Sequence, residues 1–213
     1  MRAFFLGIDV NRASADPSLH FDPSSHHYHG SMHLDETAQN IAGFVAEIRP
    51  HTPIAWAMQN KDTRPGHEHD YSAEERAFHH VLPDENRDTF MSKTRMSPYP
   101  ENREFFEDMK RQGYDTVVLA GFYASECIYW TMQDLVEAGF RVVVPTDLIA
   151  HMERSHPMHG FEDFMQDVYY NRVIFTDVQA AEYFLKCDED QRNLPPARYT
   201  WDDMNSMYFG PGS

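Results

Sequence analysis

The stretch Thr116-Val-Val-Leu-Ala-Gly-Phe-Tyr-Ala-Ser-Glu-Cys127 decides the fold of this chain. Its first six residues form an apolar run typical of a buried parallel strand, and a helical pattern runs from Ala124 to Ala138. A strand followed directly by a helix is the unit from which α/β proteins are built. The pattern therefore predicts an α/β fold with Cys127 at the start of a helix.

Cys127 is the first candidate catalytic residue. At the start of a helix, backbone N–H groups and the positive end of the helix dipole favour the thiolate, which is the nucleophilic form. We therefore expect Cys127 to react with iodoacetamide well below about pH 8.5 and faster than Cys187. The alternative is a small buried cysteine that packs as a core residue.

Asp9 and Lys93 are the next candidates because each closes a strand-like run. Asp9 ends the apolar run that begins at Phe4, and Lys93 ends the run that begins at Thr89. The carboxyl ends of parallel strands meet at one crevice, so the acid, the ammonium and the thiol of Cys127 are expected in one pocket. Such a group suits a nucleophile with its activators. Taken singly, each would more often be a strand-end cap or a solvated charge.

Strands and helices alternate along the rest of the chain, which favours a mainly parallel sheet. The predicted strands cover residues 4–10, 53–58, 89–93, 116–121, 140–145 and 173–176. The predicted helices cover residues 35–49, 100–112, 124–138, 160–170 and 178–185. Residues 11–34 and 59–88 are polar and rich in histidine, and we expect loops there, with one helical turn near residues 73–80. Residues 1–187 are expected to form the domain, and residues 188–213 a tail that packs on a neighbour or stays loose.

Composition excludes several classes of partner. The 213 residues suffice for one domain, and the formal net charge of −16 disfavours binding to nucleic acid or to an anionic membrane. The chain has two cysteines, which argues against a disulfide framework and for the cytoplasm. No run approaches the roughly 20 apolar residues of a membrane span, and Asp9 interrupts an N-terminal apolar stretch too short for a signal peptide.

The order of these motifs resembles a known family. Asp9, then Lys93-Thr-Arg-Met-Ser97-Pro-Tyr99, then Gly121-Phe-Tyr-Ala-Ser-Glu-Cys127 resembles the isochorismatase-like cysteine hydrolases over residues 2–185. That superfamily includes nicotinamidases, N-carbamoylsarcosine amidases and ureidoacrylate hydrolases. The resemblance implies a three-layer α/β/α sandwich around a mainly parallel sheet, a small-molecule substrate and a homo-oligomer.

The resemblance also implies a role for each candidate residue. Asp9 would be the general base, Lys93 the cation and Cys127 the nucleophile of a triad that cleaves an amide or ureido C–N bond through a thioester. A cis peptide bond would join Phe122 and Tyr123, and the backbone N–H groups of Tyr123 and Cys127 would form the oxyanion hole. Phe122 and Tyr123 are bulkier than the small β-branched residues usual in this element, which affects the shape of the pocket.

Further residues are candidates for binding the substrate. Gln59 and Asn60 end the second predicted strand and are candidates for hydrogen bonds to a substrate, with a simple strand-end turn as the alternative. Aromatic side chains are candidates for the walls of a pocket that takes a flat or apolar molecule, with core packing as the alternative. They are Trp56, Phe90, Tyr99, Phe122, Tyr123 and Trp130.

The sequence leaves a metal and two other functions open. Nicotinamidases bind a divalent metal through an Asp-x-His…His set after the second strand, where this chain reads Gln59-Asn-Lys-Asp62. We expect no cofactor, although Asp62, His67 and His69 have the donor chemistry for zinc or iron, and His26, His27 and His29 for adventitious metal. The alternative functions are an isochorismatase-type vinyl-ether hydrolase, whose members often lack the cysteine, and a non-catalytic binding protein on the same fold.

Overall fold

The computed structural model describes residues 1–20, 33–63, 66, 68–150, 172–188, 192–199 and 203, except for the side chains of His20, His33 and Ser125. The helix predicted at residues 160–170 lies outside these residues. So do His26, His27, His29 and His67, which were candidate metal ligands.

A central sheet of seven strands organises the molecule, in the order β5-β2-β1-β6-β7-β9, with β8 beside β6. Every pairing between these described strands is parallel. Their bounds are β1 (Arg2–Ile8), β2 (Ile54–Gln59), β5 (Thr89–Lys93), β6 (Tyr114–Phe122), β7 (Arg141–Pro145), β8 (Ile149–Ala150) and β9 (Val173–Thr176). The central strands are almost continuously apolar because helices cover both faces of the sheet.

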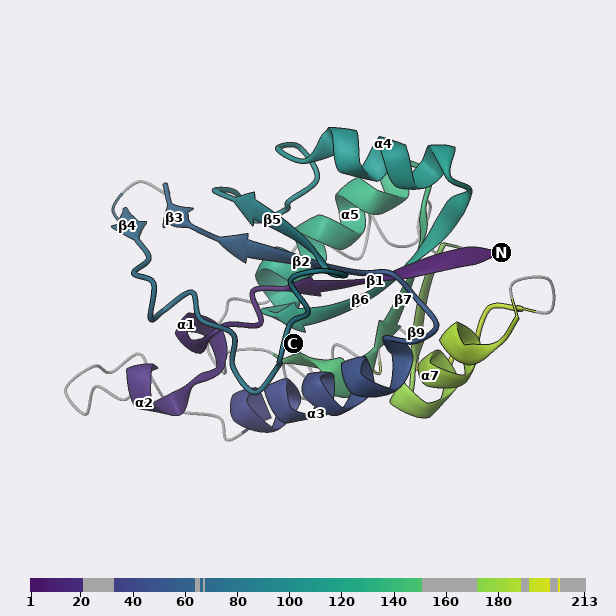
Figure 1. The fold of residues 1–213 in the computed structure, drawn as a ribbon, viewed down its shortest axis with the longest axis horizontal. Coiled ribbons are helices and arrows are strands. Elements are labelled where there is room, and N and C mark those ends of the chain that lie inside the picture. The colour runs from purple at the N-terminus through teal and green to yellow at the C-terminus, as the bar shows by residue number, and fades with distance from the viewer. Residues whose placement is uncertain are drawn as a thin grey trace.

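Helices pack on both faces, which confirms the predicted three-layer α/β/α sandwich. Figure 1 shows α4 (Arg103–Arg111) and α5 (Tyr129–Glu137) on one face and α3 (His33–Ile48) and α7 (Val178–Lys186) on the other. The carboxyl ends of β2 and β5 point toward the side of the molecule where β3 and β4 lie (Figure 1). No helix in the described parts of the chain is long and apolar enough to cross a membrane.

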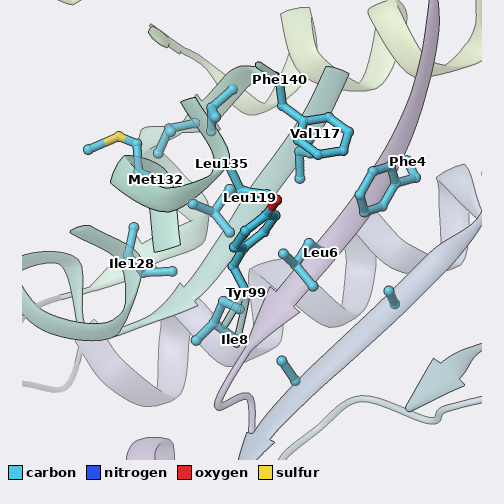
Figure 2. Close-up of a cluster of buried hydrophobic side chains, with 14 of the residues drawn as sticks. Phe4, Leu6, Ile8, Tyr99, Val117, Leu119, Ile128, Met132, Leu135 and Phe140 are labelled. Carbon is cyan, nitrogen blue, oxygen red and sulfur yellow. The ribbon is translucent and has the colours of Figure 1, made fainter. Parts of the chain in front are cut away.

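The sheet separates two hydrophobic clusters. Alternate residues of β1 point to opposite faces, so Phe4, Leu6 and Ile8 join one cluster while Ala3 and Phe5 join the other. Figure 2 shows the first cluster, which includes Leu119, Ile128, Met132, Leu135 and Phe140. The second cluster includes Trp56 from β2 together with apolar residues of α3 and α7. Because β1 is buried on both faces, the residue that follows it is held at a fixed position.

The structure differs from the sequence prediction mainly in the two polar segments. Short helices α1 (Arg12–Ala15) and α2 (Pro17–His20) follow β1 where a loop was expected. An antiparallel pair, β3 (Lys61–Asp62) and β4 (His69–Asp70), follows β2. These elements are too short to produce a recognisable hydrophobic period.

Part of the predicted tail lies against β9. Tyr199 forms an isolated bridge with Phe175 of β9, and the backbone N–H of Arg198 donates to the carbonyl of Phe175 at 2.9 Å. This part of the tail therefore packs on its own domain.

Candidate active site

Strand register brings three separate segments to one edge of the sheet. Ile8 at the end of β1 pairs with Ala57 of β2 and with Gly121 of β6. Gln59 at the end of β2 pairs with Lys93 at the end of β5. The residue after β1, the last residue of β5 and the segment after β6 therefore meet at the carboxyl edge, as parallel topology requires.

Lys93 joins the other two candidate residues. Its Nζ lies 2.7 Å from Oδ2 of Asp9 and 3.2 Å from Sγ of Cys127. The Lys93 side chain is completely buried, and only 6% of the Asp9 side chain is exposed. The structure therefore brings the three predicted residues together within hydrogen-bonding distance of one ammonium group.

The environment of Lys93 keeps its side chain charged. Burial alone lowers the pKa of Lys93, but the negative charge of Asp9 and the adjacent Cys127 outweigh burial, and the net pKa is raised. Two further acceptors surround the ammonium, the carbonyl oxygen of Arg95 at 3.3 Å and Oε1 of Gln59 at 3.5 Å. A buried cation with this set of acceptors is a fixed positive charge in the site.

Asp9 is held in an unusual backbone conformation. Its φ of 52° lies in the left-handed region, which residues other than glycine seldom adopt. The Asp9 N–H donates to the carbonyl of Ala57 at 2.9 Å, and Oδ1 accepts the backbone N–H of Gln59 at 2.8 Å. Because Oδ1 is fixed by β2 and Oδ2 by Lys93, the orientation of the carboxylate is determined by the sheet.

Cys127 lies in η1 (Ala124–Ile128), a π-helical turn that leads directly into α5. Its carbonyl oxygen accepts the hydroxyl of Thr131 at 2.6 Å, and its Sγ lies 3.8 Å from Sδ of Met96. The predicted position of Cys127 after a buried strand is therefore found, but the helix begins with a wider turn than an α-helix.

The surroundings of Cys127 favour the protonated thiol, in contrast to the expected effect of the helix start. Burial and the negative charge of Asp9 raise the pKa of the Cys127 thiol, Lys93 offsets only part of the effect, and the net pKa is about 12. The thiol is 5% exposed, so the loss of hydration outweighs the favourable effect of the helix start. At neutral pH the resting residue is a protonated thiol beside an Asp9–Lys93 ion pair.

The turn between β6 and η1 has a tightly constrained backbone. The Phe122–Tyr123 peptide bond is cis, at the position that the resemblance implies. Gly121 has a φ of 123°, and a Cβ there would lie 2.0 Å from the carbonyl oxygen of Ile8. The hydroxyl of Tyr123 donates to the backbone carbonyl of Ser14 at 3.1 Å. The backbone carbonyl of Tyr123 accepts the N–H of Ile128 at 3.2 Å. These contacts position the segment that carries Cys127.

The predicted substrate-binding residues fall into two groups. Gln59 and Asn60 are half-buried at the carboxyl edge beside Lys93, and the N–H of Asn60 donates to the carbonyl of Lys93 at 3.0 Å. Trp56, Tyr99 and Phe122, by contrast, are buried members of the two hydrophobic clusters.

Their polar atoms explain why two of these aromatic residues belong to the core. Nε1 of Trp56 donates to Oδ2 of Asp88 at 2.9 Å, and the hydroxyl of Tyr99 donates to Oε1 of Glu107 at 3.1 Å. The structure thus places Trp56, Tyr99 and Phe122 in the hydrophobic core, which is the alternative to their role as pocket walls. Phe90 and Trp130 are each 46% exposed, so they lie at the surface.

Met96, Arg95 and Thr131 contact the site but were not predicted. Met96 touches the thiol, the Arg95 carbonyl accepts from Lys93, and Thr131 binds the Cys127 carbonyl. Arg95 and Met96 lie within the Lys93–Tyr99 motif, so their proximity to Lys93 in the sequence was the available signal. Thr131 carried no signal, because a threonine one helical turn after a cysteine is common.

The described residues after β2 do not present the nicotinamidase metal set. Asp62 and His69 face each other in the β3–β4 pair, but Nε2 of His69 lies 2.9 Å from Oε1 of Glu75. Lys61, which follows Asn60, brings a cation to this position and forms an ion pair with Asp70 at 3.3 Å.

Fold and site together define the class of protein. A mainly parallel sheet between helical layers is the fold of the isochorismatase family, whose members are generally hydrolases. Residues 17–183 match the isochorismatase domain, and the chain belongs to the isochorismatase family. No functionally curated protein gives a significant match to the sequence.

Solved structures of this family share the fold at low sequence identity. A putative hydrolase of the isochorismatase family from Chromobacterium violaceum is 18% identical, with a TM-score of 0.66, over 86% of this chain and 93% of that one. N-carbamoylsarcosine amidase from Thermoplasma acidophilum is 17% identical, with a TM-score of 0.58, over 84% of this chain and 97% of that one. Nicotinamidase from Bacillus subtilis is 14% identical, with a TM-score of 0.57, over 79% of this chain and 97% of that one. These similarities concern the fold.

Proposed function

We propose that this protein is a cysteine hydrolase that cleaves an amide or ureido C–N bond of a small molecule through a thioester intermediate. The observation that carries the proposal is the position of Lys93 Nζ, 2.7 Å from the Asp9 carboxylate and 3.2 Å from the Cys127 sulfur. A buried carboxylate and ammonium beside a thiol are costly to maintain unless they act on it. Two of the structurally similar proteins are amidases by name, which agrees with this reaction class.

The first half of the reaction transfers the acyl group to the enzyme. Asp9 accepts the thiol proton while Cys127 Sγ attacks the carbonyl carbon of the substrate, and the carbonyl oxygen becomes an oxyanion. We assign the stabilisation of this oxyanion to the backbone N–H groups of Tyr123 and Cys127. As the tetrahedral intermediate collapses, the C–N bond breaks and Asp9 returns its proton to the departing nitrogen. The products are an amine or ammonia and an acyl-enzyme thioester.

The second half releases the acid. Asp9, again ionised, accepts a proton from water, and the oxygen of that water attacks the thioester carbon. The C–S bond breaks, the Cys127 sulfur regains the proton and the carboxylic or carbamic acid leaves. These steps use no metal and no cofactor.

The raised pKa of Cys127 fits this sequence of proton transfers. A thiol with a pKa of about 12 is almost fully protonated at neutral pH, so its proton must be removed as it attacks. Once Asp9 holds that proton, the sulfur faces the Lys93 ammonium without a neighbouring carboxylate. In the resting site the Lys93 ammonium is paired with Asp9. Once Asp9 is protonated, the same ammonium stabilises the developing thiolate of Cys127.

A substrate screen with a matched pair of cysteine variants tests the proposal. Nicotinamide, carbamoyl compounds and ureido compounds are incubated with the full chain, with and without a chelator, and ammonia release is measured. We expect turnover of at least one class in both conditions. Cys127→Ala is expected to abolish it, and Cys187→Ala to leave it unchanged.

The outcome also separates the two alternative functions. Ammonia release that survives in Cys127→Ala would remove this cysteine from the mechanism. Cleavage of a vinyl ether with no activity on any C–N substrate would place the protein with the isochorismatase-type enzymes. Stoichiometric binding of these compounds without turnover would identify a binding protein.

A further inference from the structure

A second cluster of metal-binding side chains lies away from Lys93. In the described parts of the chain, Asp35, His79 and His80 each offer one ligand atom, and these atoms lie within 4.8 Å of one another. Asp35 is in the first turn of α3, whereas His79 and His80 belong to the segment between β4 and β5. None of these residues takes part in the proposed hydrolysis.

Both imidazole rings point at the same carboxylate oxygen. Nε2 of His79 lies 2.6 Å and Nε2 of His80 lies 2.7 Å from Oδ1 of Asp35. The two rings are neighbours, with centroids 4.1 Å apart. The two Nε2 atoms and the carboxylate oxygen therefore provide three potential ligand atoms for one metal ion.

Two of the three ligand spacings need only a small adjustment to accommodate an ion, and the third is at most 4.8 Å. With zinc–ligand bonds of about 2.0–2.1 Å in a tetrahedral arrangement, neighbouring ligand atoms are roughly 3.3 Å apart. The observed nitrogen–oxygen distances of 2.6 and 2.7 Å therefore have to lengthen by well under 1 Å. Without an ion, each ring must instead use an Nε2–H to donate to the shared oxygen.

Neighbouring groups contact the ligands. Nε2 of Gln39 donates to Oδ2 of Asp35 at 2.6 Å, which leaves Oδ1 facing the histidines. Such a contact to the second oxygen is a common support for a carboxylate ligand. The carboxylate of Asp16, which is paired with Arg12, interacts electrostatically with His79.

The backbone around the histidines is also fixed. The His79 N–H donates to the carbonyl of Val10 at 3.3 Å, and the His79 carbonyl accepts the N–H of Val81 at 2.8 Å. His80 has a φ of 59°, in the left-handed region. The histidines are thus attached to the residues that follow Asp9 in the chain.

We propose that Asp35, His79 and His80 form a binding site for a divalent transition metal, which we assign as Zn²⁺, with water as a further ligand. Two imidazoles and one carboxylate are a donor set that suits Zn²⁺. The ion would connect the start of α3 to the segment before β5 and, through His79 and Val10, to the end of β1. This role is structural, and it is independent of the proposed hydrolysis.

Cobalt and zinc binding to the chelator-treated full-length protein test the site. Co²⁺ is added while visible absorption is recorded, and Zn²⁺ is added in a calorimeter. We expect one equivalent to bind with the absorption of nitrogen- and oxygen-ligated Co²⁺, and the melting temperature to rise. Asp35→Ala and His80→Asn are expected to weaken Zn²⁺ binding by roughly 100-fold or more, because each removes a ligand atom from the site, and even loss of a supporting contact typically costs about 10–100-fold.

Two controls make the result specific. His69→Gln removes a histidine that also contacts a carboxylate, and it should leave Zn²⁺ binding unchanged. A variant with His26, His27 and His29 all replaced by Gln should likewise keep the Co²⁺ absorption. Equal melting temperatures of the metal-free variants and wild type would show that the fold is retained. The proposal is overturned if no stoichiometric binding occurs, or if binding follows His26, His27 and His29 instead of Asp35 and His80.

Discussion

The ammonium group of Lys93 and the carboxylate of Asp9 form an ion pair of 2.7 Å that is almost completely removed from solvent. The two residues come from strands separated by β2, and the backbone of β2 holds the second carboxylate oxygen through Gln59. A buried charge loses its hydration, so each partner depends on the other. Stability and reactivity at this site are therefore linked.

Removal of one partner should cost more than removal of both. Lys93→Met leaves the Asp9 carboxylate buried without its cation, and we expect the free energy of unfolding to fall by about 3–5 kcal/mol. Adding Asp9→Asn removes the stranded charge, so the double variant should be more stable than Lys93→Met alone. Urea unfolding of the single and double variants measures the coupling. Strictly additive losses would show that the two side chains do not interact.

Reactivity of the thiol should increase when the carboxylate is removed. In the wild type, the charge of Asp9 contributes to the raised pKa of Cys127, so iodoacetamide labelling should be slow at pH 8 and accelerate toward pH 12. Asp9→Asn leaves Lys93 as the nearest charge, which lowers the pKa of Cys127. We expect labelling at pH 8 to become at least about tenfold faster, since one pKa unit changes the thiolate fraction tenfold.

Mass spectrometry of the Cys127 peptide follows this reaction, with Cys187 in the same sample as the internal reference. Substrate turnover should be lost in Asp9→Asn even as labelling accelerates, because the proton acceptor is missing. Slower labelling of the variant, or a wild-type rate that levels off near pH 8.5, would contradict the assigned role of Asp9.

Stability should fall in alkali because of the same thiol. An unfolded cysteine ionises near pH 9, whereas Cys127 in the folded protein ionises near pH 12. Between these values the unfolded state binds fewer protons than the folded state, so the free energy of unfolding decreases as the pH rises. Cys127→Ser removes this ionisation, and its stability should decrease less between pH 9 and 11. Chemical unfolding at several pH values provides the comparison, and parallel curves for both proteins would exclude the effect.

Two glycines should respond to alanine in opposite ways. A Cβ at Gly43 in α3 meets nothing within 4 Å, and alanine favours helix, so Gly43→Ala should raise the free energy of unfolding by about 0.5–1 kcal/mol. A Cβ at Gly121 would clash with the backbone of Ile8, in a conformation that L-residues rarely adopt. Gly121→Ala should therefore prevent stable folding or reduce the melting temperature strongly. Similar melting temperatures for both variants would disagree with the close approach of β6 and β1.

The sequence predicted the elements that have clear boundaries. The bounds of β5 and β9 agree with the predicted strands at residues 89–93 and 173–176, because turn residues and polar residues flank short apolar runs. Asp9, Lys93 and Cys127 were found for a related reason. Each follows or ends a strand, and parallel strands place their carboxyl ends at one edge.

The features that the sequence did not reveal depend on how deeply a residue is buried and on contacts between residues far apart in the chain. Trp56 belongs to a strand whose two faces are both buried, so its pattern did not distinguish a pocket wall from the core, and its contact with Asp88 was not visible. The raised pKa of Cys127 follows from burial, which position in the chain does not report. Likewise, Asp35 meets His79 and His80 only because α3 and the segment before β5 lie together in the fold.

The wide separation of Asp9, Lys93 and Cys127 along the chain has a consequence during biosynthesis. The acid emerges from the ribosome early, the amine midway and the sulfur last, and only pairing of β5, β2, β1 and β6 unites them. A nascent or proteolysed fragment that lacks one of these strands therefore carries an ordinary cysteine. The grouping of the acid, the amine and the sulfur is thus confined to chains in which these four strands have paired.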